Sequence, residues 1–579
     1  MTTPSSFLRL RAGLSRRPLA LAAGCGLVNA VLLIAQYWLL ASVVHDVLMA
    51  GAGLDDVWPR LWPILGLVAL RAATVWGGEA ASAAAAARVK TDVREALLDR
   101  IMALGPVRLA DRQTGELSAL LVDGVEALEP YYARFLPAMM VAALVPAAIL
   151  AVVAPTDWLS GVILAVTAPL IPLFMILIGR GAERLNQRQW ARLARMSAHF
   201  LEVLQNLTTL KLFNASRREA EVIAKVSEDY RLATMSVLRV AFASALALEF
   251  FATVSIAMVA VFIGFRLLAG EMAFQRGFFV LLLAPEFYLP LRSLGAHYHA
   301  RMEAIGAAGR MVDLLARPVP EQGRAKPRGG GGPAAISFER VGLTYGDGRV
   351  GLDGADFRLE PGTVTALVGP SGAGKSSVVS LLLGFVRPSS GRILAGGQDL
   401  AGLDLDAWRR GLAWVPQRPY LFRGTIADNL RLDAAEASDG DLVRAARLTG
   451  AAGFIEALPD GYGHVVGERG VGLSGGQARL LALTRAALRV APLLILDEPT
   501  ASLDGAAEAR IGDAVRALAP GRTVLVVAHR LETVRDAATI LVLDRGRVAE
   551  RGDHGSLMAR DGLYAALVRD GELGSGRAP

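Results

Sequence analysis

A glycine-rich loop is the stretch whose residue types and spacing predict the most definite chemistry. The apolar run 364–368 comes before it and the apolar run 378–383 after it, which predicts a strand, a phosphate-binding loop and a helix. A glycine-rich turn without a ligand is the weaker interpretation, because strand and helix flank the loop. Glycines let backbone N–H groups point at phosphate oxygens, and the helix N-terminus adds partial positive charge. The residues of the loop are Gly369, Pro370, Ser371, Gly372, Ala373, Gly374, Lys375, Ser376 and Ser377.

The loop predicts a bound nucleoside triphosphate. We expect Lys375 to reach the β- and γ-phosphates and the Ser376 hydroxyl to bind Mg²⁺. Two carboxylates, Asp497 and Glu498, end a later apolar run at 493–496. Asp497 suits the Mg²⁺ shell, and Glu498 can polarise an attacking water.

A second glycine pair lies between these motifs. Ser474, Gly475, Gly476 and Gln477 follow Leu473 and come just before a helix expected near Ala478, which predicts another phosphate site lined by amides. With this pentapeptide the chain resembles the ATP-binding cassette (ABC) ATPases, whose signature it is.

The resemblance implies roles for further residues in the order that this family shows. Tyr345 would stack on adenine, Gln417 would touch Mg²⁺ and sense the membrane domain, Asp504 would belong to the D-loop, and His529 would contact the γ-phosphate. The implied catalytic residues are Lys375, Gln417, Glu498 and His529, and the implied metal ligands are Ser376, Gln417 and Asp497. Each position holds the residue type that the chemistry needs, so we expect a cassette that hydrolyses ATP.

Composition indicates a second, membrane-embedded part. The 579-residue chain is 53% hydrophobic with a mean hydropathy of +0.40, which is high for a soluble protein. Its net charge of +7 does not indicate nucleic-acid binding, because no basic run is interleaved with aromatic residues. The single cysteine, Cys25, excludes an intrachain disulfide and is interpreted as a packing residue.

Uncharged runs predict six transmembrane helices. The first run, 18–44, extends about 40 Å as a helix, against about 30 Å of hydrocarbon. Arginines precede it and aspartates follow it, so the positive-inside rule places the N-terminus and the ATPase domain in the cytoplasm of a multi-pass protein of a bacterial-type inner membrane. The other spans are expected from Trp58 to beyond Arg88, and at 135–156, 158–179, 240–265 and 277–300.

The predicted organisation has four parts. Residues 1–317 form the membrane domain, 318–334 a Pro/Gly-rich linker, 335–570 the nucleotide-binding domain, and 571–579 a disordered tail. Two turns, near 111–120 and 206–214, are expected to contact the cassette as coupling helices beside Gln417. The fold class is an α-helical membrane domain, which resembles that of ABC exporters, joined to an α/β P-loop ATPase domain.

The last predicted span carries the most family-specific sequence outside the cassette. Residues 283–292 read LAPEFYLPLR and residues 295–301 read GAHYHAR, which resembles the CydD family. At 100° per residue, Tyr288, Arg292 and His299 share one face, with Tyr298 at its edge. We interpret these four as candidate substrate-binding residues. Alternatively Arg292 and Glu286 pair with neighbouring helices, and we expect such pairing for Arg71, Glu79 and Glu249.

The CydD resemblance implies one subunit of a heterodimer. Such a subunit exports cysteine or glutathione, or moves haem, in support of cytochrome bd assembly, with ATP and Mg²⁺ as cofactors, a CydC-like half-transporter as partner and membrane lipids around it. A homodimeric lipid or multidrug exporter is the alternative, which the full set of catalytic residues permits. A soluble ABC protein is excluded by the predicted spans.

Overall fold

The computed structural model describes residues 3–319, 323–328, 332–500, 505–528 and 534–569, apart from some side chains within them. Asp504, His529 and the tail 571–579 therefore lie outside the described residues. The chain divides into two compact units, one of residues 1–104 and 109–319, the other of residues 105–108 and 320–579. Each unit is considered by itself.

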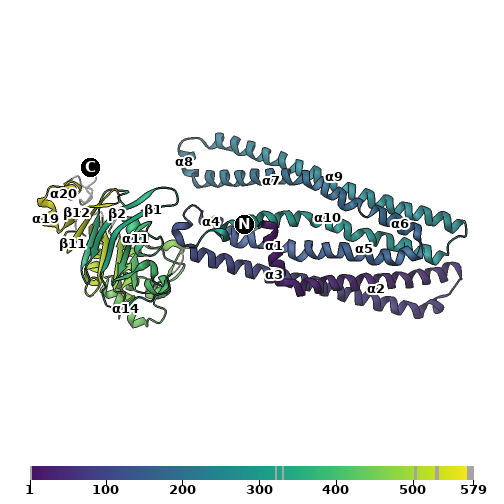
Figure 1. Cartoon of the computed structure of the whole chain (residues 1–579), viewed down its shortest axis with the longest axis horizontal. Helices are drawn as coiled ribbons and strands as arrows, with labels where there is room; N and C mark the ends of the chain where they lie inside the picture. The colour runs from purple at the N-terminus through teal and green to yellow at the C-terminus, as the bar shows by residue number, and fades with distance from the viewer. Residues whose placement is uncertain (1–2, 320–322, 329–331, 501–504, 529–533, 570–579) are drawn as a thin grey trace. The chain divides into compact units, whose positions relative to one another are not determined.

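The first unit consists of long helices (Figure 1). Its elements are α1 (Pro4–Ala12), α2 (Arg16–Met49), α3 (Leu54–Arg108), α4 (Thr114–Ala119), α5 (Leu136–Thr156), α6 (Trp158–Thr167), α7 (Leu170–Gln205), α8 (Leu207–Leu212), α9 (Ser216–Leu268) and α10 (Phe274–Ala316). The helical backbone of α3 is interrupted at Gly105 (φ +70°), and its residues 105–108 belong to the second unit. The short helices α4 and α8 stand where the sequence predicts the two coupling turns. Whether they contact the cassette stays a prediction.

Five segments of this unit are long and apolar enough to cross a membrane. They lie in α2, α3, α5, α9 and α10. The predicted fourth span is divided, because α6 ends at Thr167 and α7 begins at Leu170 after Pro169. The described apolar helix here, 158–174, is shorter than the five. The side chains of 175–179 lie outside the described part of the chain.

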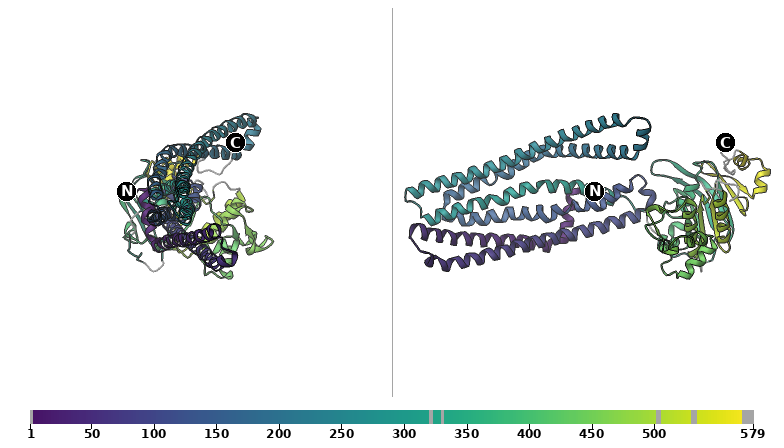
Figure 2. Two further views of the ribbon diagram at one scale, coloured as in Figure 1. Left: turned by 90° about the vertical axis from the view of Figure 1, so that its right-hand side faces the viewer. Right: turned by 180° about the vertical axis from the view of Figure 1, so that it is seen from behind.

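Two cores hold the helices together. One core is formed by α2, α5, α6, α9 and α10 and includes Ile149, Leu164, Val280 and Tyr288. A second core is formed by α1, α3 and α10 around Tyr132, whose hydroxyl donates to the Leu8 carbonyl at 2.8 Å. The helices α7 and α9 pack side by side along much of their length (Figure 2).

The second unit is an α/β domain with two main sheets. The first sheet has the order β2-β1-β4-β5 and is antiparallel. The second has the order β12-β11-β3-β10-β9-β6, and only its edge strand β12 is antiparallel. The bounds are β1 (Ile336–Thr344), β2 (Val350–Leu359), β3 (Val364–Val368), β4 (Ser390–Ala395), β5 (Gln398–Asp399), β6 (Leu412–Val415), β9 (Leu493–Asp497), β10 (Thr523–Val527), β11 (Thr539–Asp544) and β12 (Arg547–Gly552).

Helices and short strands complete this unit. They are α11 (Lys375–Leu382), α12 (Leu405–Arg410), β7 (Gly424–Thr425), α13 (Ile426–Leu430), α14 (Asp439–Leu448), α15 (Ala452–Glu456), β8 (Val465–Val466), α16 (Gly475–Leu488), α17 (Gly505–Leu518), α19 (His554–Ala559) and α20 (Leu563–Arg569).

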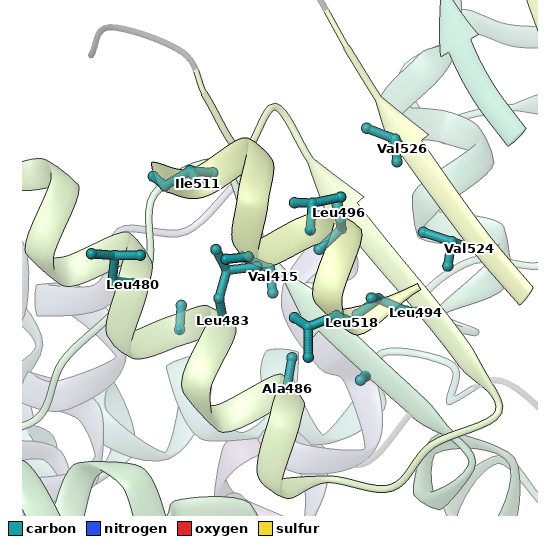
Figure 3. Packing of buried hydrophobic residues seen from close by; sticks show 14 of the residues in the cluster. Val415, Leu480, Leu483, Ala486, Leu494, Leu496, Ile511, Leu518, Val524 and Val526 are labelled. Carbon is teal, nitrogen blue, oxygen red and sulfur yellow. The ribbon is translucent and has the colours of Figure 1, made fainter. Parts of the chain in front are cut away.

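The parallel sheet is buried on both faces, as parallel sheets are. Along β10, Val524 and Val526 face one core while Leu525 and Val527 face the other, with the period of two that a strand imposes. Figure 3 shows the first core, where Leu480 and Leu483 of α16 and Leu518 of α17 pack near Leu494 and Leu496 of β9. This packing fixes the strand ends, from which the candidate site is built.

Candidate nucleotide-binding and hydrolysis site

The phosphate-binding loop joins β3 to α11, as the apolar runs predict. Gly374 precedes the helix with φ +108°, a left-handed conformation that favours glycine. A Cβ atom there would lie 2.5 Å from the Gly351 carbonyl oxygen, so a side chain does not fit. Lys375 is buried and its Nζ donates to the carbonyl oxygens of Gly369, at 2.6 Å, and Pro370, at 3.0 Å. The Lys375 ammonium is therefore folded into the loop.

Parallel pairing brings the other polar residues to the same edge of the sheet. The strands β3, β10, β9 and β6 run in the same direction, so their carboxyl ends meet. The loop follows β3, Asp497 ends β9 and Glu498 follows it, and Gln417 lies two residues after β6. The sheet thus collects residues that are 128 positions apart in the chain, from Gly369 to Asp497.

The carboxyl group of Asp497 has a raised pKa. Partial burial and the nearby charge of Glu498 raise its pKa to about 6, although Lys375 acts in the opposite direction. Burial penalises the charged form, so a cation beside Asp497 would stabilise the carboxylate.

Glu498 is held by its backbone and its side chain. Its φ of +48° lies in the left-handed region, which is uncommon for a residue other than glycine. Its amide donates to the Val527 carbonyl oxygen at 2.9 Å, and its carboxylate accepts a hydrogen bond from Nε2 of Gln417. Gln417 is also tied to α16, because Arg479 Nη2 donates to its carbonyl oxygen at 3.3 Å.

The predicted ligands fit a magnesium ion by their chemistry. The hydroxyl of Ser376, the amide oxygen of Gln417 and the carboxylate of Asp497 are the hard oxygen donors that Mg²⁺ prefers. Because Gln417 uses its nitrogen on Glu498, its amide oxygen is the atom left for a metal. Among the described residues there is no group of three or more His, Cys, Asp or Glu side chains that could hold a metal ion.

Tyr345 lies beside the loop. Its hydroxyl is 3.0 Å from the hydroxyl of Ser377, which is buried in the first turn of α11. The guanidinium of Arg349 lies 4.7 Å from the centre of its ring, and the Tyr345 amide donates to the Arg349 carbonyl oxygen. Arg349 could not be identified from the sequence, because nothing in its spacing from Tyr345 indicates that the turn places the guanidinium over the ring.

The second glycine pair forms the start of α16. Ser474 Oγ accepts a hydrogen bond from the backbone N–H of Gln477 at 3.2 Å, and Gln477 Oε1 accepts one from the backbone N–H of Ser474 at 2.8 Å. This reciprocal pair is a capping box. Ser474 and Gly475 are exposed, so these amides lie at the surface of the unit. Such a surface can face a nucleotide held by another chain.

The candidate substrate residues lie on α10. The Tyr288 side chain is fully buried and its hydroxyl is bonded to Thr167 on α6, while Arg292 forms an ion pair with Glu249 on α9. On the other face, Glu286 accepts a hydrogen bond from Tyr37 of α2 at 2.8 Å. These contacts match the alternative of pairing between helices. The side chains of Tyr298 and His299 lie outside the described part of the chain.

The chain matches two protein-family models. Residues 19–287 match the ABC transporter transmembrane region, and residues 352–501 match the family described as ABC transporter.

Curated relatives match along almost the whole chain. The glutathione/L-cysteine transport system ATP-binding/permease protein CydD of Escherichia coli (strain K12) is 37% identical over 573 residues, which cover 97% of each chain. The protein named CydC in the same transport system of Bacillus subtilis (strain 168) is 38% identical over 489 residues, covering 84% of this chain and 85% of that one.

The fold is also that of a solved transporter. A bacterial Atm1-family ABC exporter with ATP bound superposes with a TM-score of 0.79 at 27% sequence identity, covering 96% of this chain and 99% of that chain. The similarity therefore includes both units.

Proposed function

The chain belongs to the ABC exporter family as a half-transporter, and from that membership we propose that it is a CydD-like subunit that moves cysteine, glutathione or haem across the inner membrane. The observation that supports this most is the 37% identity to the Escherichia coli protein over 97% of both chains. ATP hydrolysis coupled to transport is the activity of this family. The proposal extends it to a substrate class and to a role in cytochrome bd assembly.

The site geometry supports an order of events in the ATPase unit. Lys375 leaves the loop carbonyls and binds the β- and γ-phosphates of ATP, while the loop amides hold the phosphate oxygens. Ser376, Gln417 and Asp497 would hold Mg²⁺, which when bound neutralises phosphate charge. Glu498, positioned by Gln417, orients the attacking water and takes its proton. A contact between His529 and the γ-phosphate is part of this proposal.

A second chain completes each nucleotide site. The signature at Ser474 to Gln477 lies exposed at the start of α16, where it can bind the γ-phosphate held by a partner's loop. The partner's signature would cover Lys375 of this chain in return, and Asp504 would lie at this junction. We propose a CydC-like half-transporter as the partner, with the ATPase units in the cytoplasm and Mg²⁺ in both sites.

The direct contact of substrate with α10 stays a prediction. For Arg292 to bind a substrate carboxylate, it must exchange Glu249 for that carboxylate, which a helix movement driven by ATP could bring about. Tyr288 would have to leave the core in which it is buried. A substrate role for Tyr298 and His299 is part of the same prediction.

A homodimeric lipid or multidrug exporter is the second candidate. One chain carries the P-loop, both carboxylates and the signature, so two copies would form two complete sites. The relatives named CydD and CydC have nearly the same identity to this chain, 37% and 38%, and only the wider coverage of the CydD match, 97% against 84%, favours that half of a heterodimer.

The test is reconstitution in liposomes with and without the neighbouring half-transporter. We expect cysteine, glutathione or haem to stimulate ATP turnover only when both halves are present, and the substrate to accumulate on one side. Full stimulation of the chain alone by lipids or drugs, and none by thiols or haem, would favour the homodimeric exporter instead.

A further inference from the structure

A recess of about 420 Å³ lies between α2 and α3, apart from the face of α10 already considered. It combines polar and apolar walls within the segments long enough to cross the membrane. Its lining residues are Asn29 of α2 and Val68, Arg71, Ala72, Val75, Trp76 and Glu79 of α3.

Arg71 is oriented by hydrogen bonds to two side chains of α2. Its Nε donates to Asn29 Oδ1 at 3.1 Å and its Nη1 donates to Gln36 Oε1 at 2.7 Å. Both acceptors are uncharged amides, and within the described residues no carboxylate lies at ion-pair distance from Arg71. A guanidinium has five N–H donors, so several remain for an anion in the recess. A charge at membrane depth normally faces a cavity or an opposite charge.

Glu79 provides the opposite charge at a distance. It lies eight residues after Arg71, about 12 Å along the helix, and lines the same recess. Its carboxylate has no bonded partner among the described residues. The recess therefore has a cationic end at Arg71, an anionic end at Glu79, and Val75 and Trp76 between them.

The depth of Arg71 argues against a phospholipid headgroup. Its partner Asn29 lies 11 residues from Pro18 and 15 from Val44, the ends of the uncharged run, which is about 17 and 22 Å along the helix. This position is near the middle of a hydrocarbon core of about 30 Å. A lipid phosphate lies at the edge of that core, whereas a transported solute passes through its middle.

We propose that this recess binds a zwitterionic short peptide, with a carboxylate on Arg71 and an ammonium group toward Glu79. The proposal rests on the proposed function, which supplies glutathione as the candidate, and it names a site for it; cysteine, whose two charges lie on one carbon, is too short to join Arg71 and Glu79. The apolar part of the solute packs on Val75 and Trp76. Haem is a poorer fit because its propionates can engage Arg71 but it has no ammonium group to donate hydrogen bonds to Glu79.

The single cysteine is a built-in reporter for this site. Cys25 lies one helical turn before Asn29 and packs against α3, where a Cβ on Gly78 would be 3.4 Å from the Cys25 Cβ. Its side chain is partly exposed. A solute that spans the recess toward Glu79 should shield it from a maleimide reagent.

The experiment uses the full chain reconstituted with the neighbouring half-transporter. ATP turnover is measured against glutathione and N-acetylated glutathione, each rate taken relative to the same variant without ligand. Labelling of Cys25 is followed by mass spectrometry with S-methylglutathione, which has no thiol to consume the reagent. Arg60→Gln is the control, because Arg60 pairs with Asp46 among exposed residues near the start of α3.

We expect Arg71→Gln to raise the half-saturating glutathione concentration at least tenfold, and Arg60→Gln to leave it unchanged. Glu79→Gln should reduce the preference for glutathione over its N-acetylated form. S-methylglutathione should slow Cys25 labelling at least fivefold in the unaltered protein and not in Arg71→Gln.

Failure of the site and failure of the function give different results. If glutathione stimulates the unaltered protein and Arg71→Gln equally, the site is wrong and the proposed function stands. If glutathione and cysteine stimulate neither the unaltered protein nor Arg71→Gln, the proposed thiol transport is wrong. If Arg71→Gln does not assemble with the partner, labelling of the unaltered protein decides, and unprotected Cys25 means that the recess does not bind the peptide.

Discussion

The side-chain amide of Gln417 donates a hydrogen bond to the carboxylate of Glu498, which links the residues that follow β6 and β9. Gln417 stands in the segment that leads into the helical part of the ATPase unit, and Glu498 is the proposed base. Movement of the Gln417 segment would therefore change the position of that carboxylate.

Replacing Glu498 by Gln should stop hydrolysis while nucleotide still binds. The amide keeps the size and can still bond to Gln417, but it cannot take a proton, so turnover should fall about a hundredfold or more. Turnover and equilibrium binding of a fluorescent ATP analogue are the measurements. Glu360→Gln, at an exposed pair with Arg358, is the matched control and should behave as the unaltered protein. Unchanged turnover in Glu498→Gln would refute its role as base.

Replacing Lys375 by Ala should weaken ATP binding. Charge-assisted hydrogen bonds contribute about 1.5–3 kcal/mol each, so affinity should fall by roughly 10- to 150-fold. The thermal shift produced by ATP should shrink in parallel. Arg358→Ala, which removes an exposed cation that pairs with Glu360 outside the loop, is the control. Equal affinity in Lys375→Ala would mean that Lys375 stays on the carbonyls of Gly369 and Pro370 when ATP binds.

Tyr288 should contribute to stability through its ring more than through its hydroxyl. Tyr288→Phe loses the bond to Thr167 and should cost about 1 kcal/mol, whereas Tyr288→Ala leaves a cavity and should cost about 3–5 kcal/mol. Unfolding in detergent measures both. If Tyr288→Phe abolishes the substrate response at unchanged stability, the hydroxyl contacts substrate and the role predicted from its helix face is correct.

Substitutions of Arg292 and Glu249 should have non-additive effects on the free energy of unfolding. Both side chains are about half exposed in the isolated chain, so their interaction is expected to be worth about 0.5–1 kcal/mol in a double-mutant cycle of Arg292→Gln and Glu249→Gln. The same variants report on substrate binding. A response to glutathione lost in Arg292→Gln but kept in Glu249→Gln would support direct contact, and equal loss in both would indicate only the ion pair.

The end of α8 should transmit the state of the membrane unit to hydrolysis. Leu212 and Phe213 are each 78% exposed, which is unusual for apolar side chains outside the predicted membrane spans. Changing both to Ser should lower the ratio of stimulated to basal turnover. Leu232→Ser on α9, also exposed, is the control. An unaltered ratio would remove this segment from the coupling pathway.

The fold class and family were predictable because both rest on local signals. The strand before Gly369, the carboxylates after β9 and the apolar runs each show in a few consecutive residues, and the predicted ABC exporter fold is confirmed. Helix ends were less accessible. The extension of α3 beyond Arg88 was predicted, but the interruption of its helical backbone at Gly105 and the start of α9 at Ser216 were not, since such ends depend on backbone geometry and packing that hydropathy does not report.

Contacts between distant residues were not predictable. Helix geometry correctly separated the face of Tyr288 and Arg292 from that of Glu286, since the first two contact α6 and α9 and the last contacts α2. It could not say that these faces meet Thr167 and Glu249, because that depends on how the helices pack. The two amides that hold Arg71 were missed for the same reason.

The left-handed backbone at Glu498 has a consequence for any attempt to engineer the protein. Glycine there would relieve about 1–2 kcal/mol of strain. The greater backbone entropy of glycine would also favour the unfolded chain by about 0.4–1 kcal/mol. Loss of the hydrogen bond from Gln417 would cost about 1 kcal/mol more. Because these amounts nearly cancel, the variant should melt at nearly the same temperature as the unaltered protein although it cannot hydrolyse ATP. Variants at this position must therefore be ranked by ATP turnover and not by melting temperature.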